Sequence, residues 1–128
     1  MAALTIAIDA SRATVARRTG TETYALQLIR ALIALETSHR FVLYFRDTPA
    51  PGLFPACSHV EQRVIPWPRV WTHLRFAAAL WRSRPDVTFV PAHTLPLWFP
   101  GPAVVTVHDL GYVYFPEAHP PLTRRYLD

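Results

Sequence analysis

The residues best suited to chemistry in this chain are His108 and Asp109, which directly follow the β-branched run Val104–Val107. An imidazole can exchange a proton with a substrate, or can form a hydrogen bond with a hydroxyl group. A Val and Thr run without polar alternation is typical of a strand covered on both faces, as in parallel sheets, whose ligands bind at the carboxyl ends of the strands. The pattern therefore predicts a buried strand that delivers His108 to a site. Asp109 is expected to cap the next turn or to orient His108.

Composition excludes several other classes of chemistry. All thirteen basic residues are arginine, so a Schiff-base lysine, a phosphate-loop lysine and a lysine partner for a phospho-aspartate are absent. Cys57 is the single cysteine, which rules out an intramolecular disulfide framework and a thiolate zinc site. The residues His73, His93 and Asp109 do not have the spacing of a metal site. We therefore expect neither a metal nor a cofactor, and the net charge of +4 does not indicate a nucleic-acid partner.

Length and hydropathy indicate one domain over residues 1–128, with 51% hydrophobic residues to form a core. The segment Met1–Thr5 lacks the basic start and long apolar core of a signal peptide, and no apolar run approaches membrane-spanning length. We expect a cytoplasmic protein, with peripheral contact at the inner membrane left open.

Apolar runs and breakers predict alternating strands and helices. Strands are expected over 4–8, 40–45, 60–65, 86–90 and 103–107. One helix should begin at the capping box Thr19–Glu22, and a second should run from Val70 and stop before Pro85. The predicted buried positions of the first helix are Tyr24, Leu28, Ala31, Leu32 and Leu35, widened by Ala25, Ile29 and Ile33; those of the second are Val70, Leu74, Ala77 and Trp81.

This alternation predicts an α/β, Rossmann-like three-layer domain with a mostly parallel sheet of about five strands in the order 3-2-1-4-5. In that order the loops after Asp9 and Val90 line one crevice at the switch point, and His108 lies on the same rim.

Several motifs also occur in a recognisable order. They are Ile8-Asp9-Ala10, Thr19-Gly20 before a helix that carries Tyr24, Arg84–Val87, Pro91–Pro96, Pro102–Leu110 and Phe115–Glu117. Over almost the whole chain this set is similar to the N-terminal domain of family 4 (group 1) glycosyltransferases, which have the two-domain GT-B fold. In that family the N-terminal domain mainly binds the acceptor, and the C-terminal domain holds most of the nucleotide-sugar.

The resemblance implies the acceptor-side half of a metal-independent, retaining transferase. It would move a hexose such as mannose from a nucleotide-diphosphate sugar to a saccharide or lipid-linked acceptor. The chain resembles an N-terminal domain that is itself cut short, so we expect it to be inactive without the C-terminal domain. Its fifth strand would then have an open edge, through which a homodimer could form.

Site residues also follow from the resemblance. Gly20 and Thr21 would contact the donor diphosphate, because a residue without Cβ permits close approach at a helix start. His108 would reach the donor sugar and position the transferring centre, while Arg69, Trp71 and Tyr112 would border the acceptor. Thr23 departs from the family, in which many members carry an arginine at that position. The simpler interpretations are that Gly20 only eases a turn, that Asp109 ties His108 to a turn, and that the aromatic residues belong to the core.

Two other classes of protein with the same type of sheet require residues that can be looked for in this sequence. A receiver domain needs paired acidic residues after the first strand and a lysine, and a dinucleotide-binding module needs Gly-x-Gly-x-x-Gly there. The chain has neither pattern. A non-catalytic protein-interaction domain with the same fold stays open, and it predicts no anion or sugar site near Gly20 and His108.

Overall fold

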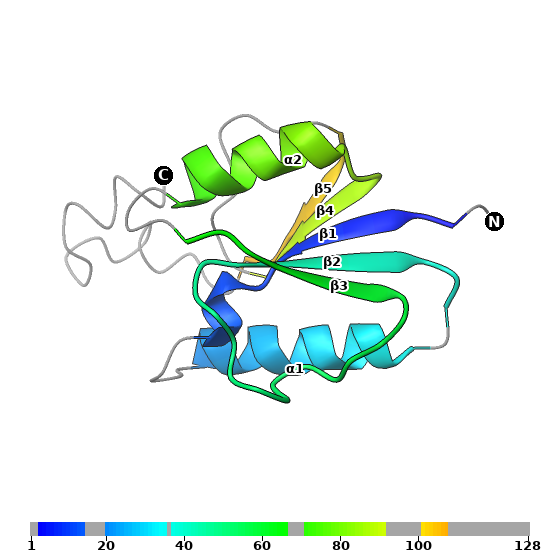
Figure 1. The fold of residues 1–128 in the computed structure, drawn as a ribbon, viewed down its shortest axis with the longest axis vertical. Helices are drawn as coiled ribbons and strands as arrows, with labels where there is room; N and C mark the ends of the chain where they lie inside the picture. The colour runs from blue at the N-terminus through cyan, green and yellow to red at the C-terminus, as the bar shows by residue number, and fades with distance from the viewer. Residues whose placement is uncertain (1–2, 15–19, 36, 67–70, 92–100, 108–128) are drawn as a thin grey trace.

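The computed structural model describes residues 3–14, 20–35, 37–66, 71–91 and 101–107. Their strands form one parallel sheet in the order β3-β2-β1-β4-β5, with a helical layer on each face (Figure 1). The strands are β1 (Thr5–Asp9), β2 (Arg40–Phe45), β3 (Val60–Val64), β4 (Val87–Val90) and β5 (Ala103–Val105). The predicted α/β class and strand order are confirmed.

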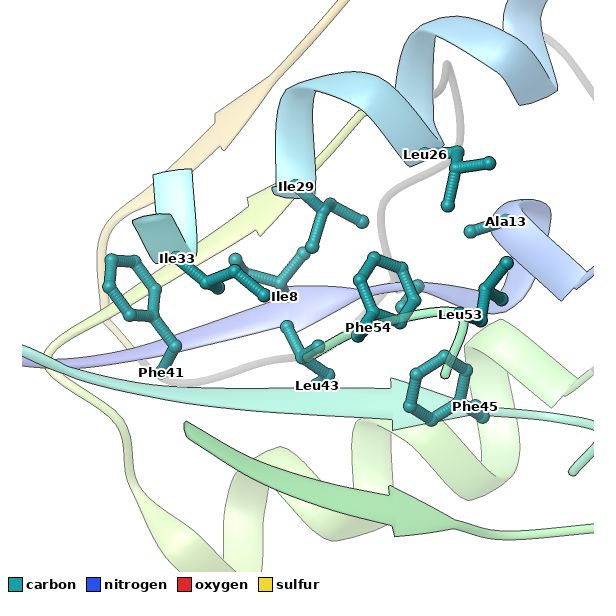
Figure 2. Close-up of a cluster of buried hydrophobic side chains, with 11 residues drawn as sticks. Ile8, Ala13, Leu26, Ile29, Ile33, Phe41, Leu43, Phe45, Leu53 and Phe54 are labelled. Carbon is teal, nitrogen blue, oxygen red and sulfur yellow. The ribbon is translucent and has the colours of Figure 1, made fainter. Parts of the chain in front are cut away.

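One face of the sheet is covered by α1 (Gly20–Ala34). The buried side chains of this layer come from α1, β1, β2 and the loop after β2 (Figure 2), and they include Leu26, Ile29, Ile33, Ile8, Leu43, Phe45, Leu53 and Phe54. Of the predicted helix face, Ala25, Ile29 and Ile33 are buried as expected. Tyr24 and Leu35 are 38% and 59% exposed, and Ala31 is exposed as well, so those three predictions are wrong. The buried face is narrower than the predicted one, and it leaves both ends of the helix at the surface.

The other face is covered by the π-helix η2 (Thr72–Phe76) and α2 (Ala77–Ser83). Its core contains Ala7, Val42, Tyr44, Trp71, Phe76, Leu80 and Val90. Of the predicted face of this helix, Ala77 is buried as expected. Leu74 and Trp81 are 53% and 42% exposed, so those two predictions are wrong. The prediction assumed α-helical periodicity throughout, and a π-helical turn rotates the side chains away from that periodicity. Val70 lies outside the described residues.

The strand β5 pairs with β4 alone among the described strands, and it ends at Val105 rather than at Val107. Val104 is 53% exposed. The prediction of a strand covered on both faces is therefore wrong here, because α1 packs over β1 and β2 and leaves the α1 side of Val104 open. An apolar run without alternation does not distinguish a central strand from such an edge strand.

None of the described helices combines the length and apolar character needed to cross a membrane.

Candidate functional site

Asp9 ends β1 at the switch point of the sheet, where the neighbouring strands β2 and β4 lie on its two sides. One of its carboxylate oxygens accepts hydrogen bonds from the Ser11 backbone N–H at 3.0 Å and from the Ser11 hydroxyl at 2.6 Å. Only 5% of Asp9 is exposed. Burial raises the pKa of Asp9, and the two bonds from Ser11 offset part of that effect. Asp9 therefore holds the start of the short 3₁₀-helix η1 (Ser11–Thr14) at the carboxyl edge of the sheet.

The first turns of α1 and the end of β5 meet at the same edge. The Tyr24 hydroxyl lies 3.3 Å from the Thr106 hydroxyl, although 82 positions separate the two residues. The backbone N–H of Thr106 donates to the Val90 carbonyl at 3.0 Å, which fixes this segment to the end of β4. His108 follows Thr106 by two residues and lies outside the described residues. The chain that leads to His108 is thus anchored next to the start of α1.

Gly20 is the first residue of α1 and is exposed. Its φ is not positive, unlike those of Gly52 and Gly101. A Cβ built on Gly20 would meet no heavy atom of the described residues within 4 Å. The interpretation that glycine is needed for a turn thus has no support in the local backbone.

The start of α1 is the place where the resemblance expects an anion. In α-helices generally, the N–H groups of the first turn have no intrahelical acceptor, and the helix dipole favours negative charge there. Thr21 is half-buried beside Gly20. Glu22 also lies in this turn, so an anion would have to share these donors with a carboxylate. Thr19, the predicted partner of Glu22 in a capping box, lies outside the described residues.

Of the three predicted acceptor residues, Trp71 alone lies among the described residues. Trp71 is 4% exposed, its ring stacks on Phe76 with centroids 5.1 Å apart, and its Nε1–H donates to the Ile65 carbonyl at 2.7 Å. The structure thus gives Trp71 a packing role, and acceptor binding by this residue stays a prediction. Arg69 and Tyr112 lie outside the described residues.

Sequence reasoning did not include Asp9, Tyr24 or Thr106 among the site residues. Asp9 carried a signal, because it closes an apolar strand that leads into a polar loop. No sequence signal indicated the contact of Tyr24 with Thr106, because it arises from tertiary structure alone. The described residues hold no group of three His, Cys, Asp or Glu side chains arranged to bind a metal ion.

No protein-family model matches the chain, and no match was found among curated proteins or among solved structures.

Proposed function

We propose that this domain is the acceptor-side half of a glycosyltransferase. The transferred sugar would come from a nucleotide-diphosphate sugar whose diphosphate lies at the start of α1. The observation that carries the proposal is the contact between Tyr24 and Thr106 at 3.3 Å. It joins the first turns of α1 to the segment that continues to His108. A phosphate-binding helix start and an imidazole at the end of a neighbouring strand are the two groups that such a site requires.

The identity of residue 20 adds a second argument. Neither the backbone conformation nor the surroundings described for Gly20 require a glycine. In a helix interior alanine is favoured over glycine by up to about 1 kcal/mol, and this difference is smaller at the first helical position, where Gly20 stands. Ligand binding would account for a glycine at position 20, because the absence of Cβ lets a diphosphate approach the backbone N–H groups.

Binding of the phosphate group is tested with Gly20→Ala. We expect this variant to be at least as stable to heat as the parent, and to bind pyrophosphate, UDP-glucose or GDP-mannose roughly tenfold more weakly, a loss of about 1.4 kcal/mol. Thr23→Ala is the matched control, because Thr23 is exposed in the same turn. Amide shifts of residues 20 and 21 during titration report the site directly. Equal affinities of the parent and Gly20→Ala for all three ligands would remove the phosphate site from α1.

The role of His108 is tested by sugar transfer in a protein that joins this domain to a donor-binding domain. We expect His108→Ala to reduce kcat by about a hundredfold or more, the usual range for a group that assists the transferring centre. Undiminished transfer would exclude His108 from the mechanism. The rival protein-interaction domain predicts no ligand-induced shift at residue 20 and no transfer, so the two experiments also separate these classes.

A further inference from the structure

A polar cavity lies on the α2 face of the sheet, away from the carboxyl-end site. Its volume is about 220 Å³, and its lining comes from β1, β2, β3 and the end of α2. The small side chains of Ala7 and Val42 form part of this lining. Since one water occupies about 30 Å³ of liquid, the cavity has room for several waters or for one small organic ion.

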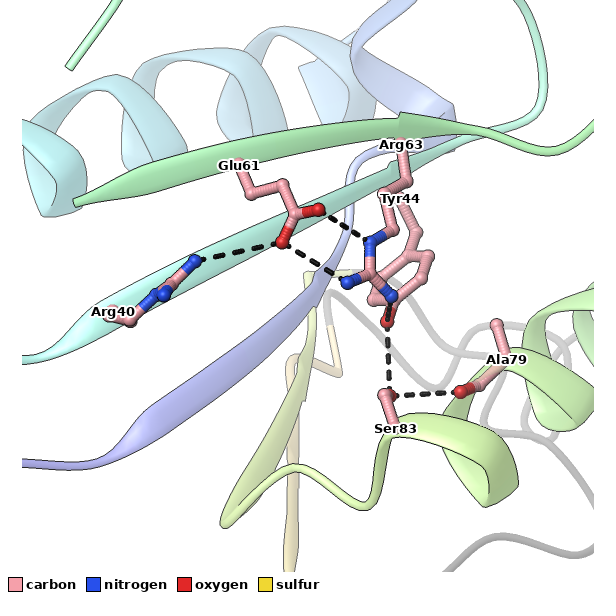
Figure 3. Close-up of polar contacts among 6 residues, drawn as sticks. All are labelled: Arg40, Tyr44, Glu61, Arg63, Ala79 and Ser83. Carbon is pink, nitrogen blue, oxygen red and sulfur yellow. Dashed lines mark hydrogen bonds and ion pairs between the residues drawn. The ribbon is translucent and has the colours of Figure 1, made fainter. Parts of the chain in front are cut away.

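The charged groups of the cavity come from two neighbouring strands. The β2–β3 register sets Val42 opposite Glu61 and Tyr44 opposite Arg63. Arg63 donates to both carboxylate oxygens of Glu61, at 3.0 and 3.1 Å, whereas Arg40 approaches Glu61 only to 3.7 Å (Figure 3). Two guanidinium groups thus share one carboxylate, so the lining side chains carry a net charge of +1. The Asp86 carboxylate lies at the edge of the cavity, where it accepts from the Thr5 backbone N–H at 2.7 Å.

The hydroxyl groups of Ser83 and Tyr44, which line the cavity, form a chain of hydrogen bonds whose donors and acceptors are fixed. The Ser83 hydroxyl donates to the Ala79 carbonyl at 2.9 Å, so it accepts from the Tyr44 hydroxyl at 3.2 Å. The Tyr44 oxygen in turn accepts from Arg63 Nη1 at 3.4 Å (Figure 3). Both hydroxyl hydrogens are committed to this chain of bonds. The groups left for a ligand are the N–H groups of arginine, which cannot accept hydrogen bonds, and the hydroxyl of Thr5, which can donate or accept.

In the cavity lining, hydrogen-bond donors outnumber free acceptors, and the charged side chains sum to +1. These two properties favour an anion as the ligand. The backbone N–H of Arg40 donates to the Leu4 carbonyl at 2.8 Å, but its guanidinium group makes no hydrogen bond within the described part of the chain. The side chain is 62% exposed at the cavity. Its planar array of five N–H donors matches the oxygens of a carboxylate or a phosphate. We propose that this cavity binds a small anion through Arg40, with Arg63 as the second donor. The proposal shares no residue with the carboxyl-end site and does not depend on the proposed glycosyltransferase function.

The experiment follows the Nε–Hε resonances of arginine by NMR, at constant ionic strength, during titration with sodium acetate or with inorganic phosphate. Saturable shifts of Arg40 and Arg63 with either probe support the site. Saturation by acetate alone identifies a carboxylate ligand, and saturation by phosphate alone a phosphate ligand. Shifts that stay linear with both probes, and that equal those of Arg82 on α2, would overturn the proposal.

Three substitutions sharpen the test. Arg40→Gln should weaken binding of the saturating probe roughly tenfold or more, because charge-assisted hydrogen bonds contribute about 1.5–3 kcal/mol. Glu61→Gln should strengthen it, since the competing carboxylate is removed. Arg82→Gln is the control, as Arg82 is exposed on α2 and does not line the cavity. Equal affinities of Arg40→Gln and Arg82→Gln, or weaker binding by Glu61→Gln, would contradict an anion site at this place.

Discussion

The α1 face of the sheet is covered by a helix of 15 residues, whereas the α2 face is covered by seven α-helical residues preceded by a π-helical turn. The layer under α1 is an apolar cluster that extends into the loop after β2, where Leu53 and Phe54 are buried. The layer under α2 contains the buried hydroxyl of Thr88, which has no hydrogen-bond partner, and borders a polar cavity. The comparison shows that one face of this sheet carries a continuous apolar cluster, whereas the other combines a smaller core with a buried hydroxyl and a polar cavity.

The largest difference between the faces is expected for truncation of a helix residue in each core. Ile29 on α1 and Leu80 on α2 are both 0% exposed, and loss of either side chain to alanine should cost about 2–5 kcal/mol. We expect Ile29→Ala in the upper half of that range and Leu80→Ala in the lower half, because packing next to a cavity relaxes more readily. Urea unfolding of both variants measures the two costs. Equal costs would show that the cavity does not loosen the α2 layer.

The pH dependence of stability gives the next effect. Burial raises the pKa of Asp9 above its ordinary value of 3.8, so the folded protein holds this proton more tightly than the unfolded chain does. The free energy of unfolding should therefore fall as the pH rises from about 4 through the raised pKa of the folded state. Asp9→Asn should remove this part of the slope, measured by urea unfolding between pH 4 and 8.

Asp47→Asn is the control for that series, because Asp47 is exposed. A slope that is the same in the parent and in Asp9→Asn would show that the folded environment of Asp9 does not favour its protonated form.

The smallest effect concerns Thr88, whose hydroxyl is buried without a partner in the α2 layer. Thr88→Val replaces that hydroxyl with a methyl group of similar size, and should raise the free energy of unfolding by about 1 kcal/mol. Thr88→Ser keeps the hydroxyl and loses the methyl group, so it should lower stability by about 1 kcal/mol. Thermal unfolding separates the two. A destabilised Thr88→Val would mean that this hydroxyl is satisfied in solution, for example by a water.

The parts of the fold that sequence predicts well are those fixed by local patterns. The run Arg40–Phe45 is bounded by polar residues, and its strand was predicted at both ends. The order of strands followed from their alternation with helices and from the handedness of the connections. The open edge of β5 was expected from the resemblance and not from local patterns, and among the described strands β5 pairs with β4 alone. The exposure of Val104 depends on how far α1 extends over the sheet.

Both candidate sites depend on contacts that sequence does not encode locally. The capping pattern predicted a helix start near Gly20, where α1 begins. The diphosphate-binding role of Gly20 and Thr21 came from the resemblance and stays a prediction. The contact of Tyr24 with Thr106 spans the domain. Arg63 lies opposite Tyr44 because of the register between β2 and β3. A long loop separates those strands, so local sequence does not fix their register. Such pairings follow from the assembled sheet, which explains why the polar cavity had no sequence signal.

The π-helical turn also has a consequence for how this chain tolerates insertions and deletions. The buried aromatic residues Trp71 and Phe76 are five positions apart, and Leu80 follows Phe76 by four. Removal of one residue within Thr72–Phe76 would leave two intervals of four, which is the spacing of an ordinary α-helix. A shortened chain could therefore keep the same three side chains in the core with a regular helix. The π-helical turn thus keeps Trp71, Phe76 and Leu80 in one core although their spacing is five and then four positions.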